Sequence, residues 1–264
     1  MRDFVYHGSD GCQLHATALG QGPGIVLLHG GGPDRYSLLP LARLLADDFS
    51  VVLPDVRGYG RSVCTDPDRH HWAQYTDDVE ALLGHLGWHR AVVGGTGLGG
   101  TVTLRAAAAC PDSIRAAVVI SMEDIEDDAA KEAESAMLDA FAVRVNQRGI
   151  DAAWEPILPM LAPVIGALVR DAIPRSHPAS IAAACAIGRD RAFTQVTELA
   201  SITVPTLVIA GADARHPAAL ASEAARILPH GHLADVSLSA SLETAVDLAE
   251  ALAPAIRDFL ITHR

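Results

Sequence analysis

Positive charge is scarce in this chain of 264 residues. The chain contains 20 Lys and Arg against 32 Asp and Glu, which gives a net charge of −12, and Lys131 is its only lysine. A chain with this balance has no basic face to meet the phosphates of a polynucleotide. We therefore expect no nucleic-acid partner and look for a small-molecule substrate or ligand instead.

Long apolar runs and paired cysteines are also missing. No stretch reaches the roughly 18 consecutive apolar residues of a membrane span, and no basic segment followed by an apolar run opens the sequence. The four cysteines, at positions 12, 64, 110 and 185, form no C-x-x-C pair, which favours isolated thiols in a reducing compartment. His70 and His71 lack the further ligands that a metal site requires. These features predict a cytoplasmic protein without membrane, metal or cofactor, and leave the oligomeric state open.

Apolar runs alternate with helical patterns along most of the chain. Residues 24–29 (GIVLLH) form a continuous apolar run that is typical of a strand buried on both faces of a sheet. Further strands are predicted at residues 50–54, 90–93, 116–120, 203–210 and 233–236, and helices at residues 36–47, 72–86, 98–110, 217–228 and 242–261. This order predicts an α/β fold with a mostly parallel central sheet and helices on both faces. Two short segments, 4–7 and 13–18, are separated by a GSDG turn and are expected to form an antiparallel edge.

The alternation breaks between residues 123 and 201. This interval is helical by pattern and is cut into short pieces by several prolines. An insertion at this point of an open α/β sheet lies over the carboxyl ends of the strands, where such sheets bind ligands. We therefore predict a core made of residues 1–122 and 202–264, and a helical cap made of residues 123–201.

The most informative motif is the glycine-rich turn at residues 93–100 (VGGTGLGG). An apolar strand enters this turn and a helix leaves it near Leu98, as in the strand–turn–helix motif G-x-S-x-G. The register of the glycines puts Gly97 at the tip, where that motif has its nucleophilic serine. Thr96 fits the tip only in a shifted frame that loses the glycine two positions later, so we expect a packing or hydrogen-bonding role for it. The turn is predicted to carry no nucleophile.

Together with two further segments, this turn resembles the α/β-hydrolase superfamily. Residues 29–33 (HGGGP) are similar to its oxyanion loop, and residues 54–62 (PDVRGYGRS) match its D-x-R-G-x-G-x-S segment. The resemblance covers essentially the whole chain and implies a capped α/β-hydrolase fold. It also implies that the backbone N–H of Leu98 and that of Gly30 or Gly31 point at one spot and stabilise a developing anion. Tyr36, which follows the glycines, is expected at the rim of the pocket.

The chain departs from the superfamily at its catalytic triad, whose expected order is nucleophile, acid, histidine. The loop after the last strand should supply the histidine, but residues 233–261 contain none, and one of residues 238–241 takes its place. In residues 211–217 (GADARHP), counting from Gly211 puts Ala214 at the acid position, whereas counting back from Pro217 puts Asp213 there. We prefer Asp213, because a one-residue deletion in a turn costs less than loss of the only carboxylate. Both partners of a Ser–His relay are predicted to be absent.

Three side chains are left as candidates for proton transfer: Glu123, Asp213 and His216. Residues 121–125 (SMEDI), which contain Glu123, resemble the M-E-x-I segment from which some haloalkane dehalogenases supply their acid, but no Asp stands at position 97 to perform dehalogenation. A carboxylate that is partly desolvated by cap residues can serve as a general base. Alternatively, Glu123 and Asp213 are solvated acids at strand ends or helix caps. His216 is either a displaced base or a histidine of a surface loop.

Two functions fit these features. The first is an enzyme of hydrolase fold that acts on a small organic molecule without a covalent serine intermediate, by oxyanion stabilisation and carboxylate acid–base catalysis; hydrolysis, elimination, isomerisation and cyclisation all fit. The second is a catalytically inactive, ligand-binding pseudohydrolase. On this basis a Gly97→Ser variant should remain nearly inactive as an esterase, because no histidine would activate the new serine.

Overall fold

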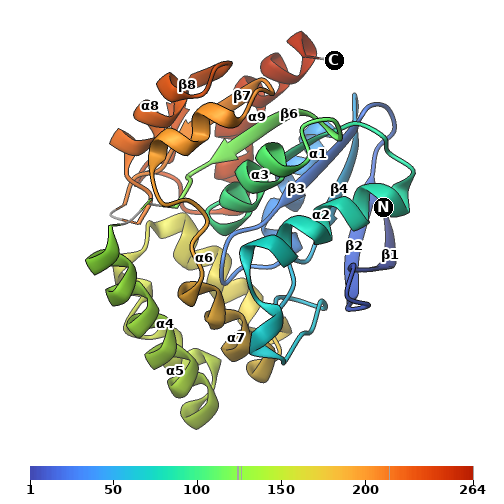
Figure 1. Ribbon diagram of the computed structural model, residues 1–264. Coiled ribbons are helices and arrows are strands. Elements are labelled where there is room, and N and C mark those ends of the chain that lie inside the picture. Colours follow the sequence, from blue (N-terminus) through green and yellow to red (C-terminus); the bar gives the residue numbers. More distant parts are fainter. Residues whose placement is uncertain (124, 126, 214, 264) are drawn as a thin grey trace.

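One sheet of eight strands, in the order β1-β2-β4-β3-β5-β6-β7-β8, organises the molecule (Figure 1). The structure is a computed structural model, and it describes residues 1–123, 125, 127–213 and 215–263. The strands are β1 (Arg2–His7), β2 (Gln13–Leu19), β3 (Gly24–Leu28), β4 (Ser50–Pro54), β5 (Ala91–Thr96), β6 (Ile114–Ile120), β7 (Thr206–Ala210) and β8 (Gly231–Ser237). β1 pairs with β2, and β2 with β4, in antiparallel fashion; the pairs from β4 to β8 are parallel. The mostly parallel sheet and its antiparallel edge are confirmed.

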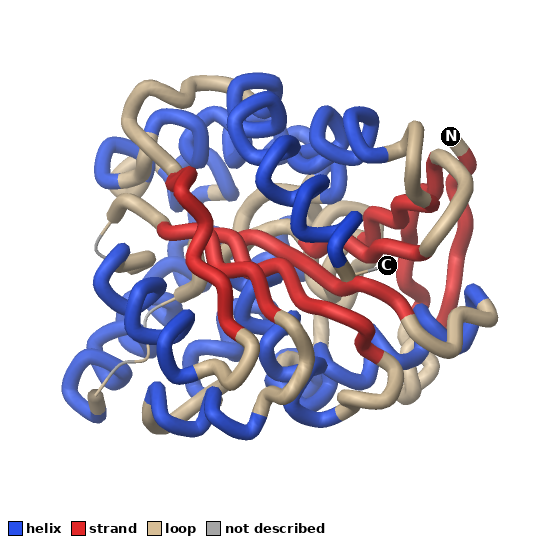
Figure 2. Tube along the Cα trace, turned by 90° about the horizontal axis from the view of Figure 1, so that it is seen from above, coloured by secondary structure: helices blue, strands red, loops and turns tan. Residues whose placement is uncertain are grey.

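Helices cover both faces of this sheet, as Figure 2 shows from above. The helices are α1 (Leu39–Leu45), α2 (Trp72–Leu86), α3 (Leu98–Ala109), α4 (Asp128–Arg148), α5 (Ile150–Trp154), α6 (Pro163–Ala172), α7 (Pro178–Ala184), α8 (Ala218–Ile227) and α9 (Ala245–Thr262). Helices α2, α3 and α8 share one apolar core with the sheet, and α1 and α9 share the other. Burial of apolar side chains in two layers, one on each face, fixes the sheet between them.

The glycine-rich segment that enters α3 is held by close packing. A side chain at Gly95 would collide with the backbone of Gly99, and one at Gly99 would collide with the carbonyl oxygen of Leu28. Because these glycines have no side chains, the backbone of α3 can lie in direct contact with the backbones of β5 and β3. β5 also extends to Thr96 rather than ending at residue 93 as predicted, because its glycines pair in parallel with β6 as far as Thr96 and Ile120.

Between β6 and β7 the described chain forms helices α4 to α7, which Figure 1 shows gathered together on one side of the sheet. Phe141 and Val145 of α4 form a separate small core with Ile150, Ile181 and Cys185. Helix α6 differs, because its Val164 and Leu168 belong to the core shared by α1 and α9. The helical content predicted for this interval is present. Its division from the core at residues 123 and 201 stays a prediction.

The predicted helix at residues 36–47 is shorter than expected. It begins as a 3-10 turn, Arg35–Leu38, and becomes α1 only from Leu39, with Pro40 in its first turn. Asp34 caps the 3-10 turn by accepting a hydrogen bond from the N–H of Tyr36 at 3.0 Å.

Among the helices that the structure describes, none combines the length and the apolar character needed to cross a membrane.

Candidate active site

Gly97 lies at the tip of the turn between β5 and α3. Its backbone dihedrals, φ 49° and ψ −118°, are in a region that residues with a side chain rarely adopt. Its N–H donates to the carbonyl oxygens of Ile120 and Ser121, at 3.0 and 3.1 Å, which anchors the turn to the end of β6. The sharp turn inferred from the glycine pattern is therefore present, with a glycine at the point where the motif projects a side chain.

Three segments far apart in the sequence converge on Gly97. An ideal Cβ built on this glycine would lie 3.3 Å from His216 Nε2, 3.9 Å from Gly30 Cα and 4.0 Å from the carbonyl oxygen of Ser121. His216 comes from the loop after β7, Gly30 from the loop after β3, and Ser121 from the end of β6. The imidazole thus faces the position that a nucleophilic side chain would occupy.

His216 is held in this orientation by Asp213. One carboxylate oxygen of Asp213, Oδ1, accepts hydrogen bonds from the backbone N–H groups of Arg215 and His216, both at 3.0 Å, and lies 2.7 Å from His216 Nδ1. Because a carboxylate oxygen can only accept, Nδ1 is the donor, and in the neutral imidazole the lone pair is then on Nε2, which faces Gly97. Both side chains are mostly buried, at 14% and 18% exposure.

Hydrogen bonding also sets the charge of Asp213. Burial raises the pKa of this carboxyl, but the hydrogen bond from His216 and those from the two backbone N–H groups outweigh burial, so the pKa lies below its ordinary value. Asp213 is therefore a carboxylate at neutral pH. Ala214, the alternative acid position, lies outside the described residues.

The loop after β8 contains no histidine, and of the two roles left open for His216 the geometry supports that of a displaced base. His216 supplies the imidazole from the loop after β7, one strand earlier than the triad order implies. At the expected position after β8, Leu238 is buried in the core, and Ser239 and Ser241 are hydrogen-bonded to each other at 2.7 Å. Sequence position named His216 as a candidate but left its role open, because a short turn rather than an aligned motif brings the imidazole back onto Asp213.

Glu123 lies in an ion-paired cluster beside this pair. Its carboxylate is 3.9 Å from the guanidinium of Arg215, which also pairs with Glu134 of α4 at 2.7 Å. The hydroxyl of Thr101 donates to Glu123 at 3.5 Å. A small cavity of about 40 Å³ is lined in part by Thr101, Glu123, Glu134 and Lys131. Glu123 is therefore engaged by a cation and a hydroxyl, whereas His216 Nε2 faces Gly97.

The loop after β3 contributes two glycines and a structural histidine. A side chain at Gly30 would lie 3.3 Å from the carbonyl oxygen of Thr96, and one at Gly31 would lie 3.6 Å from Tyr59 Oη and 4.0 Å from Leu98 Cβ. In the part of the chain that the structure describes, no hydrogen bond engages the N–H of Gly31 or Leu98. His29 fixes the loop, since its Nε2 accepts from the N–H of Val56 at 2.9 Å.

Tyr59 is a site residue that the sequence interpretation missed. Its hydroxyl lies beside Gly31, and its ring meets His29 edge to face at 5.5 Å. Burial above all, with smaller effects from Cys185 and Glu123, raises the pKa of Tyr59 well above its ordinary value, so the phenol keeps its proton and can donate. The signal was its place in the D-x-R-G-x-G-x-S segment, between two glycines.

Tyr36 lies elsewhere. Its hydroxyl accepts a hydrogen bond from Arg35 at 3.2 Å, and its ring lies between the guanidinium groups of Arg35 and Arg175, at 4.7 and 5.2 Å. None of the described contacts of Tyr36 involves Gly97, His216 or the glycines at positions 30 and 31. Its predicted place at the rim of the pocket therefore has no supporting contact.

A larger cavity, of about 420 Å³, opens between residues 194–196 and α8. Its wall includes Pro217, the neighbour of His216, but neither Gly97 nor the glycines after β3 line it. Its size alone does not make it the reaction site.

Among the described residues, no group of three or more His, Cys, Asp or Glu side chains is arranged to hold a metal ion.

Comparison with known proteins agrees with the fold. A model of the alpha/beta hydrolase family matches residues 25–251. The chain is 32% identical to 2-(acetamidomethylene)succinate hydrolase of Mesorhizobium japonicum over 134 residues, or 50% of this chain and 45% of the relative. It is 32% identical to fluoroacetate dehalogenase of a Burkholderia species over 113 residues, or 41% of this chain and 37% of the relative. The matched part thus spans less than half the length of these curated relatives.

A solved structure extends the likeness to nearly the whole chain. The enol-lactonase of Burkholderia xenovorans superposes with a TM-score of 0.81 and 26% sequence identity, covering 98% of this chain and all of that one. The three-dimensional similarity therefore includes both the sheet and the helices between β6 and β7.

Proposed function

Because this chain belongs to the alpha/beta hydrolase family, we propose that it is an enzyme that acts on a small organic substrate with His216, rather than a serine, as the reacting group of the protein. The observation that carries this proposal is the position of His216 Nε2, 3.3 Å from the place of a Cβ on Gly97. A glycine there leaves room for a water molecule or a substrate group next to the imidazole. Relatives that hydrolyse small molecules support the same class of reaction.

Proton transfer follows from the orientation of the imidazole. A water molecule beside Gly97 donates to Nε2 and attacks an electrophilic carbonyl carbon, and the imidazole takes its proton. Asp213 stabilises the imidazolium that forms and keeps Nδ1 protonated throughout. The imidazolium then returns the proton to the leaving group. The same base can remove a proton from a substrate carbon, which would give an elimination or isomerisation instead.

Negative charge that develops on the substrate is met by fixed donors. We assign this role to the N–H groups of Gly31 and of Leu98, the first residue of α3, and to the protonated hydroxyl of Tyr59; a side chain at Gly31 would lie near both Leu98 and that hydroxyl. Glu123 is assigned a positioning role, because it pairs with Arg215, next to His216 in the chain, and accepts from Thr101. This revises the hypothesis that a carboxylate moves the proton.

The helices between β6 and β7 are assigned the role of a cap over this site. A side chain at Gly32 would collide with the indole of Trp154 in α5, and Glu134 of α4 pairs with Arg215. Both contacts bring the insertion against loops that carry site residues. A cap in this position excludes bulk water and limits the substrate to a small molecule.

The first test replaces the proposed base. A substrate is identified by incubating the purified protein with a metabolite extract and following consumed compounds by mass spectrometry. With that substrate, His216→Gln should lower kcat by about 10² to 10⁴, the usual contribution of a general base, while thermal unfolding stays unchanged. Equal kcat for the wild type and His216→Gln would contradict the proposal.

Asp213→Asn isolates the charge of the carboxylate. All three hydrogen bonds to Asp213 end on one oxygen, which an asparagine keeps. The imidazole should therefore hold its position and lose only the charge that stabilises the imidazolium, so kcat should fall about tenfold, less than in His216→Gln. A loss as large as that of His216→Gln would mean that Asp213 reacts with the substrate itself.

Oxygen isotope transfer separates direct water attack from a covalent carboxylate intermediate. In a single turnover in water enriched in heavy oxygen, with enzyme in excess, a hydrolysis product should carry the label after the first turnover. If Glu123 or Asp213 were the nucleophile and water then attacked its carboxyl carbon, the first product would be unlabelled and the carboxylate of the protein would carry the label after that turnover.

A ligand-binding role without catalysis is the competing function, and the glycine at position 97 is the observation that favours it. It predicts a compound from the extract that is retained on the protein and released unchanged. It also predicts that His216→Gln alters binding alone, with no protein-dependent product in either variant.

A further inference from the structure

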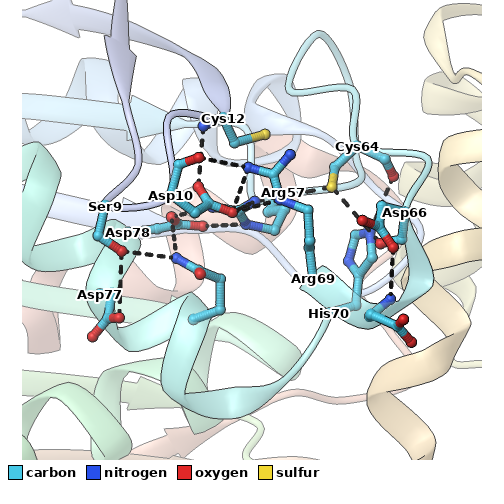
Figure 3. Close-up of polar contacts among 12 residues, drawn as sticks. Ser9, Asp10, Cys12, Arg57, Cys64, Asp66, Arg69, His70, Asp77 and Asp78 are labelled. Atoms are coloured by element: carbon cyan, nitrogen blue, oxygen red, sulfur yellow. Dashed lines mark hydrogen bonds and ion pairs between the residues drawn. The ribbon is translucent and has the colours of Figure 1, made fainter.

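Two clusters of polar side chains lie apart from the reacting imidazole, and they differ in how fully their hydrogen bonds are satisfied. In the first, which Figure 3 shows, every side-chain nitrogen of Arg57 donates to a carboxylate of Asp10 or Asp78. This guanidinium has no donor left for a ligand, so its cluster stabilises the fold. The second cluster surrounds the cavity of about 40 Å³ beside Glu123, and one of its buried donors has no acceptor.

That donor is the indole of Trp72, the first residue of α2. Trp72 lines the cavity and is 6% exposed, and no acceptor among the described residues lies within hydrogen-bond distance of its Nε1. An indole N–H can only donate. A buried donor without an acceptor costs free energy, and buried polar groups in folded proteins rarely lack a partner. An acceptor that enters the cavity from outside would satisfy this N–H.

The position of Trp72 is fixed by its backbone. Its N–H donates to the carboxylate of Asp190 at 2.9 Å, and its carbonyl oxygen accepts from the hydroxyl of Thr76 at 2.9 Å. Asp190 also accepts from the N–H of Arg191 at 2.8 Å, and residues 191–193 line the same cavity. The start of α2 and this wall are therefore held together before any ligand binds, which reduces the entropy that binding costs.

A second donor in the cavity is positively charged. Lys131, the only lysine of the chain, lines the cavity, and the one partner that the described contacts give its ammonium group is Glu134, at 2.8 Å. An ammonium group has three N–H donors. Lys131 can therefore keep its bond to Glu134 and donate to a further acceptor.

The other charges around the cavity also favour an anion. Arg191 lines the cavity, and its carboxylate partner Asp128 is fully exposed, so solvent screens that pair. Arg215 pairs with both carboxylates of the wall, Glu123 and Glu134, at 3.9 and 2.7 Å.

Among the described groups around the cavity, three cations thus face two carboxylates that are mostly shielded from solvent. The cations are Lys131, Arg191 and Arg215, and the carboxylates are 22% and 16% exposed. One further carboxylate would balance these charges. It would also accept from the indole.

We propose that this cavity binds a carboxylate of the substrate, with Trp72 Nε1 and Lys131 Nζ as its donors. The inference rests on the function proposed above, since the carboxylate would lie beside Thr101, whose N–H donates to the carbonyl oxygen of Gly97 at 3.0 Å. At the 10–15 Å³ that a water-sized group needs, the cavity takes about three heavy atoms, as many as a carboxylate has. The substrate class is a small carboxylic acid whose reacting carbon lies a few bonds from the carboxylate.

The first test measures binding without turnover. The indole nitrogens of the three tryptophans are labelled with heavy nitrogen, and the full-length protein is titrated with acetate at constant pH and ionic strength. Trp88→Phe and Trp154→Phe assign two of the three indole N–H signals in the magnetic resonance spectrum, which leaves that of Trp72. The Trp72 signal should shift and saturate. The signal of Trp88, which packs against Gly24 at the start of β3, should not move.

Acetamide and Lys131→Met isolate the contribution of charge. Acetamide presents a carbonyl oxygen of similar size without a negative charge, and Lys131→Met removes the ammonium group but keeps an unbranched apolar chain. Each should weaken binding about tenfold or more relative to acetate and the wild type, because hydrogen bonds between charged groups are the stronger ones. A Trp72 signal that does not respond to acetate, equal affinity for acetate and acetamide, or unchanged affinity in Lys131→Met would each overturn the proposal.

The second test uses the substrate identified for His216. That substrate should be a carboxylic acid, and Lys131→Met should raise its KM about tenfold or more while kcat changes less than about twofold, because the carboxylate is held equally in the ground and transition states. Trp72→Phe, which keeps an aromatic ring without the N–H, should also raise KM. The methyl ester of the same carboxylate should show no such difference between the wild type and Lys131→Met. Equal KM values for the acid in all three proteins would overturn the proposal.

The subsite and the proposed reaction can fail separately. His216→Gln should bind acetate as the wild type does, because the imidazole is not among the residues that line this cavity. Unchanged kcat in His216→Gln, with the Trp72 signal still responding to acetate, would contradict the reaction and support the subsite. Lower kcat in His216→Gln, with a Trp72 signal that ignores acetate, would support the reaction and overturn the subsite.

Discussion

Two arginines each join two carboxylates from distant segments, in opposite surroundings. Arg57 pairs with Asp10 and Asp78 and is 0% exposed, whereas Arg215 pairs with Glu123 and Glu134 and is 41% exposed. Removing one partner of a buried pair leaves an uncompensated charge in a low-dielectric interior, but solvent screens an exposed pair and replaces its partners. The ion pairs of Arg57 therefore stabilise the fold, whereas those of Arg215, beside the site, can break and re-form at little cost in free energy.

Gly97→Ser should produce the largest change in either region. The new hydroxyl lies next to His216 Nε2, and the imidazole has to yield only a few tenths of an ångström to the new Cβ. Position 97 already has the strained backbone of a nucleophile at such a turn. Gly97→Ser should react with a fluorophosphonate probe and hydrolyse activated esters about 10² to 10⁴ times faster than the double variant that also carries His216→Gln. This reverses the sequence-based expectation of an inactive variant.

Gly97→Ala is the matched control for the serine, because it adds the Cβ without the hydroxyl. It should not label with the probe and should hydrolyse activated esters no faster than the wild type. If Gly97→Ser labelled as slowly as Gly97→Ala, the imidazole would not be close enough to activate the serine.

Arg57→Gln should cause the largest loss of stability. Asp10 and Asp78 would lose their shared cation while remaining partly or fully buried, and removal of one partner from a buried pair costs about 3–5 kcal/mol. Urea unfolding monitored by circular dichroism measures the change in the free energy of unfolding.

Arg215→Gln is the control for that measurement. It removes the same guanidinium from an exposed pair, so the free energy of unfolding should fall by no more than about 1 kcal/mol. If Arg57→Gln and Arg215→Gln lowered the free energy of unfolding equally, burial would not be the reason why the two clusters differ.

Asp10→Asn should cost less stability than Arg57→Gln, because Arg57 keeps Asp78 as a partner, and its effect should depend on pH. Burial raises the pKa of Asp10, but hydrogen bonds from Arg57, the N–H of Cys12 and Arg69 lower it far below its ordinary value. The carboxylate therefore stabilises the folded state above the unfolded pKa of about 3.9, and this contribution is lost as the pH falls towards the folded pKa. The difference in unfolding free energy between wild type and variant should be constant above about pH 5 and narrow below about pH 4. A constant difference down to pH 2 would exclude this linkage.

The fold was predictable because strands that are buried on both faces of the sheet appear in the sequence as continuous apolar runs. β3 (GIVLL) and β4 (SVVLP) are continuous apolar runs, and the GSDG turn marked the antiparallel hairpin. The end of β5 was misplaced because glycines normally terminate a strand. Here the parallel neighbour β6 keeps Gly94 and Gly95 extended, which is a tertiary effect that no local pattern records.

The site was predictable only in part. Gly97 and Asp213 followed from motif register, but the role of His216 stayed open because it depends on a turn that folds the imidazole back onto Asp213. The place of Tyr59 was missed entirely, since its hydroxyl lies beside Gly31 only where the loop after β4 packs against the loop after β3. Contacts of this kind depend on the packing of distant loops, which sequence spacing does not encode.

The left-handed backbone of Gly97 also has a consequence at the level of the gene. A glycine codon of the form GGT or GGC becomes a serine codon by a single base substitution. Gly97 holds the turn, and His216 and Asp213 already stand behind it. Where the codon of Gly97 is GGT or GGC, one base substitution would therefore put a serine hydroxyl beside the imidazole of His216 without any rebuilding of the fold.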